Sequence, residues 1–308
     1  MRYFDAHCDT MLSLCDTLQD LGENDLHVDL KRTASLEKYS QIFAVWVDDV
    51  YRGEEAWQLV RRVSSYALDQ LRRQERHMVL CTNWEQYQGA MEAGKGAAVL
   101  SLEGAHGLGG RPERIEELYQ LGFRLVNLTW NGENELGCGC MAGNGGLKPM
   151  GRELLSRMAR LGMLADVSHL SERGFWEAAE SGCTLIATHS NSRSVWEHPR
   201  NLTDEQFQEL VRQGTGAGIN LYGPFVGGGK DLTQLCRHIE RFLELGGEDH
   251  LFIGADWDGM DQPAAGLRGI QDMSALYGQL YKLNYNERLL DKIFYGNLEE
   301  ILRKTLQK

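Results

Sequence analysis

Residues 2–10 read RYFDAHCDT, a short apolar run that ends in the polar pair His7 and Asp9. Seven more short apolar runs follow along the chain, separated by longer stretches that include clear helical patterns. We expect strands at residues 2–7, 41–47, 97–103, 123–129, 162–168, 184–189, 216–222 and 251–256. Eight such alternations predict an α/β fold with a parallel barrel, a (β/α)8 TIM barrel, with residues 1–308 as a single domain.

The segments between these runs carry helix signals. Apolar residues recur at three- and four-residue intervals in residues 56–74, 114–121, 175–181, 207–213 and 235–245. Thr203 and Gln206 fit a capping box at one helix start. Glycines at 94, 122, 162, 182, 214 and 246 stand between helix and strand, where a left-handed residue commonly ends a helix. A doubly wound open sheet is the main alternative, but no glycine fingerprint for phosphate follows the first strand.

Composition excludes several classes of partner. The chain has 308 residues, 42% of them hydrophobic, which is enough for a sizeable core. Its net charge of −12 repels phosphate backbones and anionic lipid, so we expect neither a nucleic acid nor a membrane partner. Seven scattered cysteines are typical of reduced thiols. No signal-peptide pattern or membrane-length apolar run occurs, and we therefore predict a cytoplasmic protein.

Metal-type side chains stand at the ends of five expected strands. In a barrel of this kind, the carboxyl ends of the strands converge on one active site. Alone, Glu103 could pair with an arginine and His169 could be a capped core histidine. Together they favour a metal site, because buried charges need a partner or a metal, and imidazole and carboxylate suit zinc. The side chains are His7, Asp9, Glu103, His169, His189 and Asp256.

These residues lie in motifs that resemble the membrane (renal) dipeptidase family, peptidase family M19. The motifs are FDAHCDT, SLEGAHGL, LADVSHLS, ATHSNSR, HPRNLTDEQ and IGADWDGM, in that order over nearly the whole chain. Members of the family are (β/α)8 barrels that hold two zinc ions and cleave dipeptides. The resemblance implies that His7 and Asp9 bind one zinc ion, that His169 and His189 bind the other, and that Glu103 bridges both.

The resemblance also implies residues for substrate. Asp256 corresponds to the aspartate at the catalytic water, which also contacts substrate, and Arg200 to the arginine that binds the substrate carboxylate. Tyr222 falls where the family lines its pocket. Trp130, in LTWN, replaces the family histidine at the scissile carbonyl. Indole has one neutral donor and no proton to exchange. Three alternatives follow: zinc mainly stabilises the oxyanion, another group such as His106 assists, or turnover is slow.

The function implied is that of a zinc-dependent dipeptidase, in which a hydroxide shared by two zinc ions attacks the peptide bond. Asp256 would pass the proton of the water to the leaving amine. A two-pronged bond from Arg200 would select dipeptides with a free carboxylate, L-Xaa-L-Xaa and, as in the family, L-Xaa-D-Xaa. The same ligands accept manganese or cobalt. Family analogy suggests a homodimer.

Two other functions stay open at this point. An amidohydrolase-type metallohydrolase could act on a non-peptide amide or ester. Such sites usually begin with His-X-His and often carry a lysine carbamate, whereas this chain has His7, Asp9 and Glu103. A catalytically weak metal- or peptide-binding protein is the other alternative, which Trp130 suggests and the full ligand set disfavours.

Overall fold

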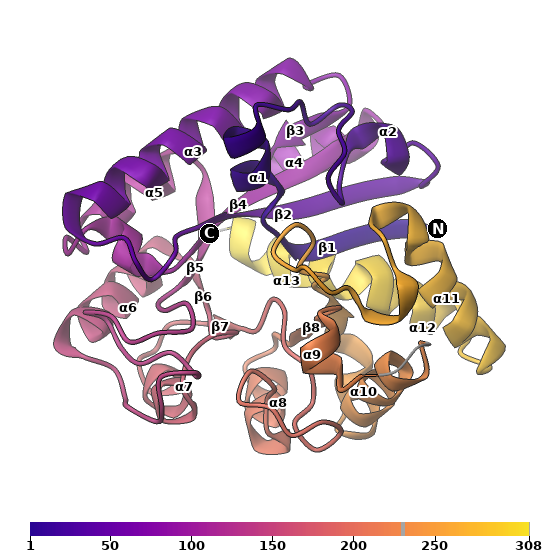
Figure 1. Ribbon diagram of the computed structural model, residues 1–308. Coiled ribbons are helices and arrows are strands. Elements are labelled where there is room, and N and C mark those ends of the chain that lie inside the picture. Colours follow the sequence, from indigo (N-terminus) through magenta and orange to yellow (C-terminus); the bar gives the residue numbers. More distant parts are fainter. Residues whose placement is uncertain (229–231, 308) are drawn as a thin grey trace.

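A ring of parallel strands surrounded by helices forms the centre of the computed structural model, which describes residues 1–228 and 232–307 (Figure 1). The strands follow the order β7-β6-β5-β4-β2-β1-β9-β8, and a parallel bridge from Ala187 to Ala217 brings the ring close to closure. The predicted TIM barrel is therefore confirmed. The strands are β1 (Arg2–Cys8), β2 (Lys38–Trp46), β3 (Met78–Leu80), β4 (Gly96–Glu103), β5 (Phe123–Asn127), β6 (Leu164–Asp166), β7 (Leu185–Ile186), β8 (Ala217–Ile219) and β9 (Leu251–Ile253).

Helices cover the outside of the ring, and the predicted ones appear within a few residues of their expected bounds. The capping box of Thr203 and Gln206 is present. Among the described helices, none combines the length and apolar character that crossing a lipid bilayer requires. The helices are α1 (Thr10–Thr17), α2 (Leu30–Thr33), α3 (Gly53–Arg73), α4 (Trp84–Glu92), α5 (Arg114–Gln120), α6 (Pro149–Leu161), α7 (Glu172–Ala179), α8 (Asp204–Arg212), α9 (Gly223–Val226), α10 (Thr233–Glu244), α11 (Met273–Lys282), α12 (Glu287–Asp291) and α13 (Asn297–Leu306).

Two features of the sheet differ from the prediction. Strand β3 was not expected; it pairs only with β4, outside the ring, and its run of three residues is too short to show a period. Strands β6 to β9 span only two or three residues each, so the remaining residues of the predicted strands belong to loops. Several of the metal-type side chains therefore stand on loops that follow the strands.

The interior of the ring changes from apolar to polar along the strands. Phe4, Val99 and Leu125 form one buried cluster with Leu298 and Leu302 of α13, which packs against β9 and, as Figure 1 shows, lies beside β1. Side chains along a strand alternate between its two faces, so residues two or four positions further on also face the interior. This rule turns several polar side chains inward at the carboxyl ends of the strands: Glu103, Asp166 and Thr188.

Candidate active site and metal centre

A bulge in β1 turns His7 into the ring. Alternation from Phe4 and Ala6, both in the interior cluster, would direct Cys8 inward and His7 outward. The pairing with β2 shifts by one residue between Asp5 and Cys8, and such bulges re-aim side chains beside active sites. Asp9 lies past the strand, at the start of α1, where its side chain caps nothing. His7 Nε2 and Asp9 Oδ2 nevertheless lie 3.7 Å apart.

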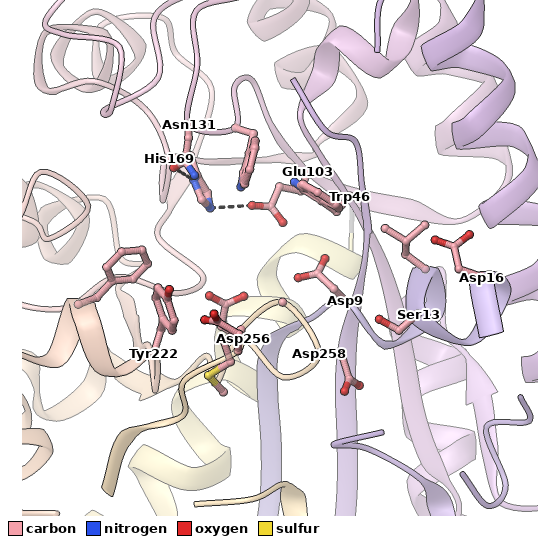
Figure 2. A pocket seen from close by; sticks show the side chains of 16 residues that line it. Asp9, Ser13, Asp16, Trp46, Glu103, Asn131, His169, Tyr222, Asp256 and Asp258 are labelled. Atoms are coloured by element: carbon pink, nitrogen blue, oxygen red, sulfur yellow. Dashed lines mark hydrogen bonds and ion pairs between the residues drawn. The ribbon is translucent and has the colours of Figure 1, made fainter. Parts of the chain in front are cut away.

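Glu103, the last residue of β4, lies at the centre of the predicted ligands. Its Oε2 is 3.1 Å from His7 Nε2, and its Oε1 is 2.6 Å from His169 Nε2 and 3.8 Å from His189 Nε2. Figure 2 shows the carboxylates of Asp9 and Glu103 turned toward one space, with His169 beside Glu103. The structure therefore brings together the five residues to which the family resemblance assigns the metal ions.

Polar contacts behind two of the imidazoles orient the rings so that their Nε2 atoms face Glu103 and each other. His169 Nδ1 donates to Asn131 Oδ1 at 3.0 Å, and His189 Nδ1 lies 2.7 Å from the Thr188 hydroxyl. Their Nε2 atoms are only 2.9 Å apart. Two lone pairs this close repel each other unless a proton or a metal ion lies near both, and buried imidazole with carboxylate is a zinc-type ligand set.

Orphaned atoms on the other side of Glu103 fit a metal ion as well. His7 Nε2 and Asp9 Oδ1 are buried and have no hydrogen-bond partner among the described residues. His7 Nε2 is close to Glu103, but the two atoms do not form a well-directed hydrogen bond. Buried polar atoms without partners are costly, and a cation between them would remove that cost. The residues on both sides of Glu103 thus fit metal ions.

Burial and mutual charge interactions shift the pKa values of the side chains around Glu103. Burial, and then the charge of Glu103, raise the pKa of Asp9 to about 7. Burial also opposes ionisation of Glu103, but His169 and His7 outweigh it and lower its pKa. For His7, the carboxylates of Glu103 and Asp9 outweigh burial and raise the pKa well above its ordinary value. Burial lowers the pKa of His189 well below its ordinary value, with the charge of His7 adding to the effect.

Asp256 follows β9 and faces the same space. Its Oδ1 lies 3.9 Å from His7 Nε2, and its Oδ2 accepts a hydrogen bond of 2.9 Å from the Asn220 amide. Its φ of 69° is a left-handed conformation that non-glycine residues seldom adopt. Such strain gathers at functional sites, where the surrounding structure fixes it. Asn220 therefore holds the carboxylate of a residue with a strained backbone toward His7.

A cavity of about 580 Å³ opens in front of the ligands. The rings of Trp46 and Trp130 meet edge to face on one wall, with their centroids 4.9 Å apart. The rings of Tyr222 and Phe225 meet edge to face on another wall, with their centroids 4.7 Å apart. Helix α1 contributes part of the rim. The lining residues include Asp9, Leu12, Ser13, Asp16, Trp46, Glu103, Trp130, Asn131, His169, Tyr222, Phe225, Asp256, Asp258 and Met260.

Arg200 and His106 lie outside this lining. Arg200 is buried behind Phe225, with its guanidinium carbon 5.1 Å from that ring. It donates to the carbonyl oxygens of Ser168 and His189, while its Nε has no partner among the described residues. His106 lies 3.1 Å from the carbonyl oxygen of Asp48, away from the cavity. A substrate role for Arg200 therefore stays a prediction.

Several polar residues of the site were not singled out from the sequence. They are Asn131, Asp166, Thr188, Asn220 and Asp258, each within a few residues of a predicted site residue. Asp258 accepts hydrogen bonds from the Thr10 hydroxyl and from the N–H of His27. The repeated pattern of a polar residue at a strand end was the available signal, but polar residues are also common in loops.

Comparison with known proteins places the whole chain in one family. The family model described as membrane dipeptidase (peptidase family M19) matches residues 1–308. The chain belongs to this family. An uncharacterised Klebsiella pneumoniae protein in the pqqA 5′ region is 32% identical over 229 residues, 69% of this chain and 83% of that protein. An uncharacterised dipeptidase of Schizosaccharomyces pombe is 31% identical over 226 residues, 69% of this chain and 54% of its own length.

Solved structures of the family share the fold. The crystal structure of a metallopeptidase named dipeptidase AC, of family M19, has a TM-score of 0.92 and 25% identity, covering 100% of this chain and 99% of that chain. The resemblance seen in the sequence motifs is thus confirmed. Family membership makes the M19 chain a hydrolase of the metallodipeptidase group, and the clustered His, Asp and Glu side chains agree with its metal requirement.

Proposed function

We propose that this M19 chain is a zinc-dependent dipeptidase that hydrolyses dipeptides with a free C-terminal carboxylate. The observation that carries the proposal is the convergence of His7, His169 and His189 on the two oxygens of Glu103, with Asp9 Oδ2 3.7 Å from His7 Nε2. His7 and Asp9 would hold one zinc ion, His169 and His189 the other, and Glu103 would touch both. Zinc bound there would supply Lewis acidity and a nucleophile at neutral pH.

The proton transfers of the reaction are assigned to Asp256. Asp256, held by Asn220, is the base that takes a proton from the attacking water and returns it to the leaving amine. Its carboxylate and the ligand His7 are close enough to face the same water. The Asp256 carboxylate is already held in place by Asn220 before the reaction. It therefore needs no reorientation while the proton is transferred.

The cavity suits a small substrate with two side chains. The pair Trp46 and Trp130 and the pair Tyr222 and Phe225 present aromatic surface on two walls. Arg200 would bind the free carboxylate through its unpartnered Nε and one terminal nitrogen, after a turn of the guanidinium away from a carbonyl partner. A bidentate arginine contact distinguishes a terminal carboxylate from a continuing peptide chain.

One paired measurement tests the proposal. Zinc-loaded protein is assayed against a panel of L-Xaa-L-Xaa and L-Xaa-D-Xaa dipeptides with and without chelator, beside elemental analysis for zinc. We expect about two zinc ions per chain and hydrolysis that the chelator abolishes. Glu103→Gln should lose both metals and the activity, whereas Glu85→Gln, on an exposed position of α4, should retain both. A Glu103→Gln variant with two zinc ions would refute the bridging role.

A further inference from the structure

One threonine hydroxyl lies between two of the proposed metal ligands. Thr188 Oγ1 is 2.7 Å from His189 Nδ1 and 3.5 Å from His7 Nδ1, and it donates a hydrogen bond to Asp166 Oδ2. All four side chains are buried. Since His7 and His189 are the proposed ligands of different ions, this single hydroxyl touches one ligand of each metal site.

Asp166 itself is not free to bind a metal ion, although it lies close enough. Ligand-type atoms of Asp166, His7 and His189 lie within 4.8 Å of one another. The Oδ1 atom of Asp166, however, accepts from the N–H and the hydroxyl of Ser168, at 3.1 and 2.7 Å, and from the N–H of Thr188 at 3.0 Å. Its Oδ2 accepts the Thr188 hydroxyl proton. Asp166 therefore acts on the site through Thr188.

The count of protons then fixes the state of His189. A threonine hydroxyl has one proton and two lone pairs. Since that proton goes to the Asp166 carboxylate, the contact of Thr188 with His189 is made by an Nδ1–H that donates to Oγ1. A neutral imidazole with its proton on Nδ1 has its lone pair on Nε2. That is the nitrogen that faces Glu103 and His169.

We propose that Asp166 and Thr188 are positioning residues that set the tautomer of His189 and steady the ring of His7. Hydrogen bonds behind a ligand histidine orient its ring and raise its basicity, and their loss commonly weakens metal binding about 10- to 100-fold. The shorter contact to His189 makes its metal site the more dependent of the two. This inference rests on the proposed function, because it assumes that His7 and His189 bind metal.

A matched pair of variants separates the hydroxyl from the bulk of the side chain. Thr188→Val keeps the shape and loses the hydroxyl, whereas Thr188→Ser keeps the hydroxyl. Zinc affinity is measured by competition with a chromophoric chelator, and thermal melts of the metal-free proteins report their folding. We expect Thr188→Val to bind the zinc ion of the site that holds His189 about 10- to 100-fold less tightly. Thr188→Ser should bind nearly as tightly as the wild type.

Reversal of the hydrogen bond gives a second, independent variant. In Asp166→Asn, the new amide would donate to Thr188 Oγ1, and the threonine proton would turn to His189 Nδ1. The imidazole proton would then lie on Nε2, where the metal must bind. We expect weak binding at this site and a changed absorption spectrum of the cobalt-loaded protein, with the metal-free fold retained. This variant decides the question if Thr188→Val does not fold.

The outcomes distinguish this inference from the proposed function. If Thr188→Val binds two metal ions as tightly as the wild type, the positioning role is wrong while the dipeptidase proposal stands. Equal losses in Thr188→Ser and Thr188→Val, with a normal Asp166→Asn variant, would also overturn it, because packing would then explain the loss. If the wild type binds no metal, the proposed function fails first.

Discussion

The substitution Gly259→Ala tests the site geometry with a single methyl group. A Cβ atom built on Gly259 would lie 2.2 Å from Asp9 Oδ2 and 2.7 Å from Asp256 Oδ1. Non-bonded heavy atoms rest about 3.5 Å apart, so the Asp9 carboxylate would have to withdraw by roughly 1 Å. A displacement of that size in a catalytic constellation costs about 100-fold in rate, or about 2.7 kcal/mol of transition-state stabilisation.

The assay for Gly259→Ala combines kcat/KM for a dipeptide with the zinc content of the purified variant. We expect kcat/KM to fall about 100-fold, with zinc lost first from the side of the site that holds His7 and Asp9. Gly89→Ala is the matched control, because nothing lies within 4 Å of a methyl group at that position of α4. It should stabilise the helix by about 0.5–1 kcal/mol and leave kcat/KM unchanged. Full zinc content and wild-type kcat/KM in Gly259→Ala would refute the arrangement of Asp9 and Asp256 described above.

Three further predictions address substrate, acid stability and the replaced histidine. Arg200→Ala should raise KM far more than it lowers zinc content, and an unchanged KM would eliminate the carboxylate clamp. Burial lowers the pKa of His238, which accepts from the N–H of Ser192 and lies against the Val226 carbonyl, to about 4. Since its unfolded pKa is about 6.5, the free energy of unfolding should fall by about 3 kcal/mol as pH drops from 6.5 to 4. Urea melts of His238→Gln should lack that slope, and an equal slope would contradict the assignment. Trp130→Phe should lower kcat less than about 10-fold if zinc carries the oxyanion; a loss of 100-fold or more would identify the indole as the donor.

The sequence predicted the barrel because the alternation of apolar runs and helical periods is a property of each short segment. It also predicted which side chains converge, since strand ends meet at one face of a barrel. Alternation along a strand does not explain the convergence of His7 and Asp9, because a bulge turns His7 inward and Asp9 lies beyond the strand.

Features that depend on exact packing were beyond reach from the sequence. The three residues of β3 carry too little pattern to be recognised as a strand. The position of Arg200 behind Phe225 follows from how its loop packs, not from its distance to His189 along the chain. The hydrogen bond between Thr188 and Asp166 could not be predicted either. It depends on the side-chain geometry of two residues at the ends of neighbouring strands.

The most direct test of the metal centre is anomalous X-ray scattering at the zinc edge from crystals of the zinc-loaded protein. We predict two peaks, one between His7, Asp9 and Glu103 and the other between Glu103, His169 and His189. A single peak, or peaks that do not flank Glu103, would contradict the bridged pair of metal ions from which the proposed chemistry is derived.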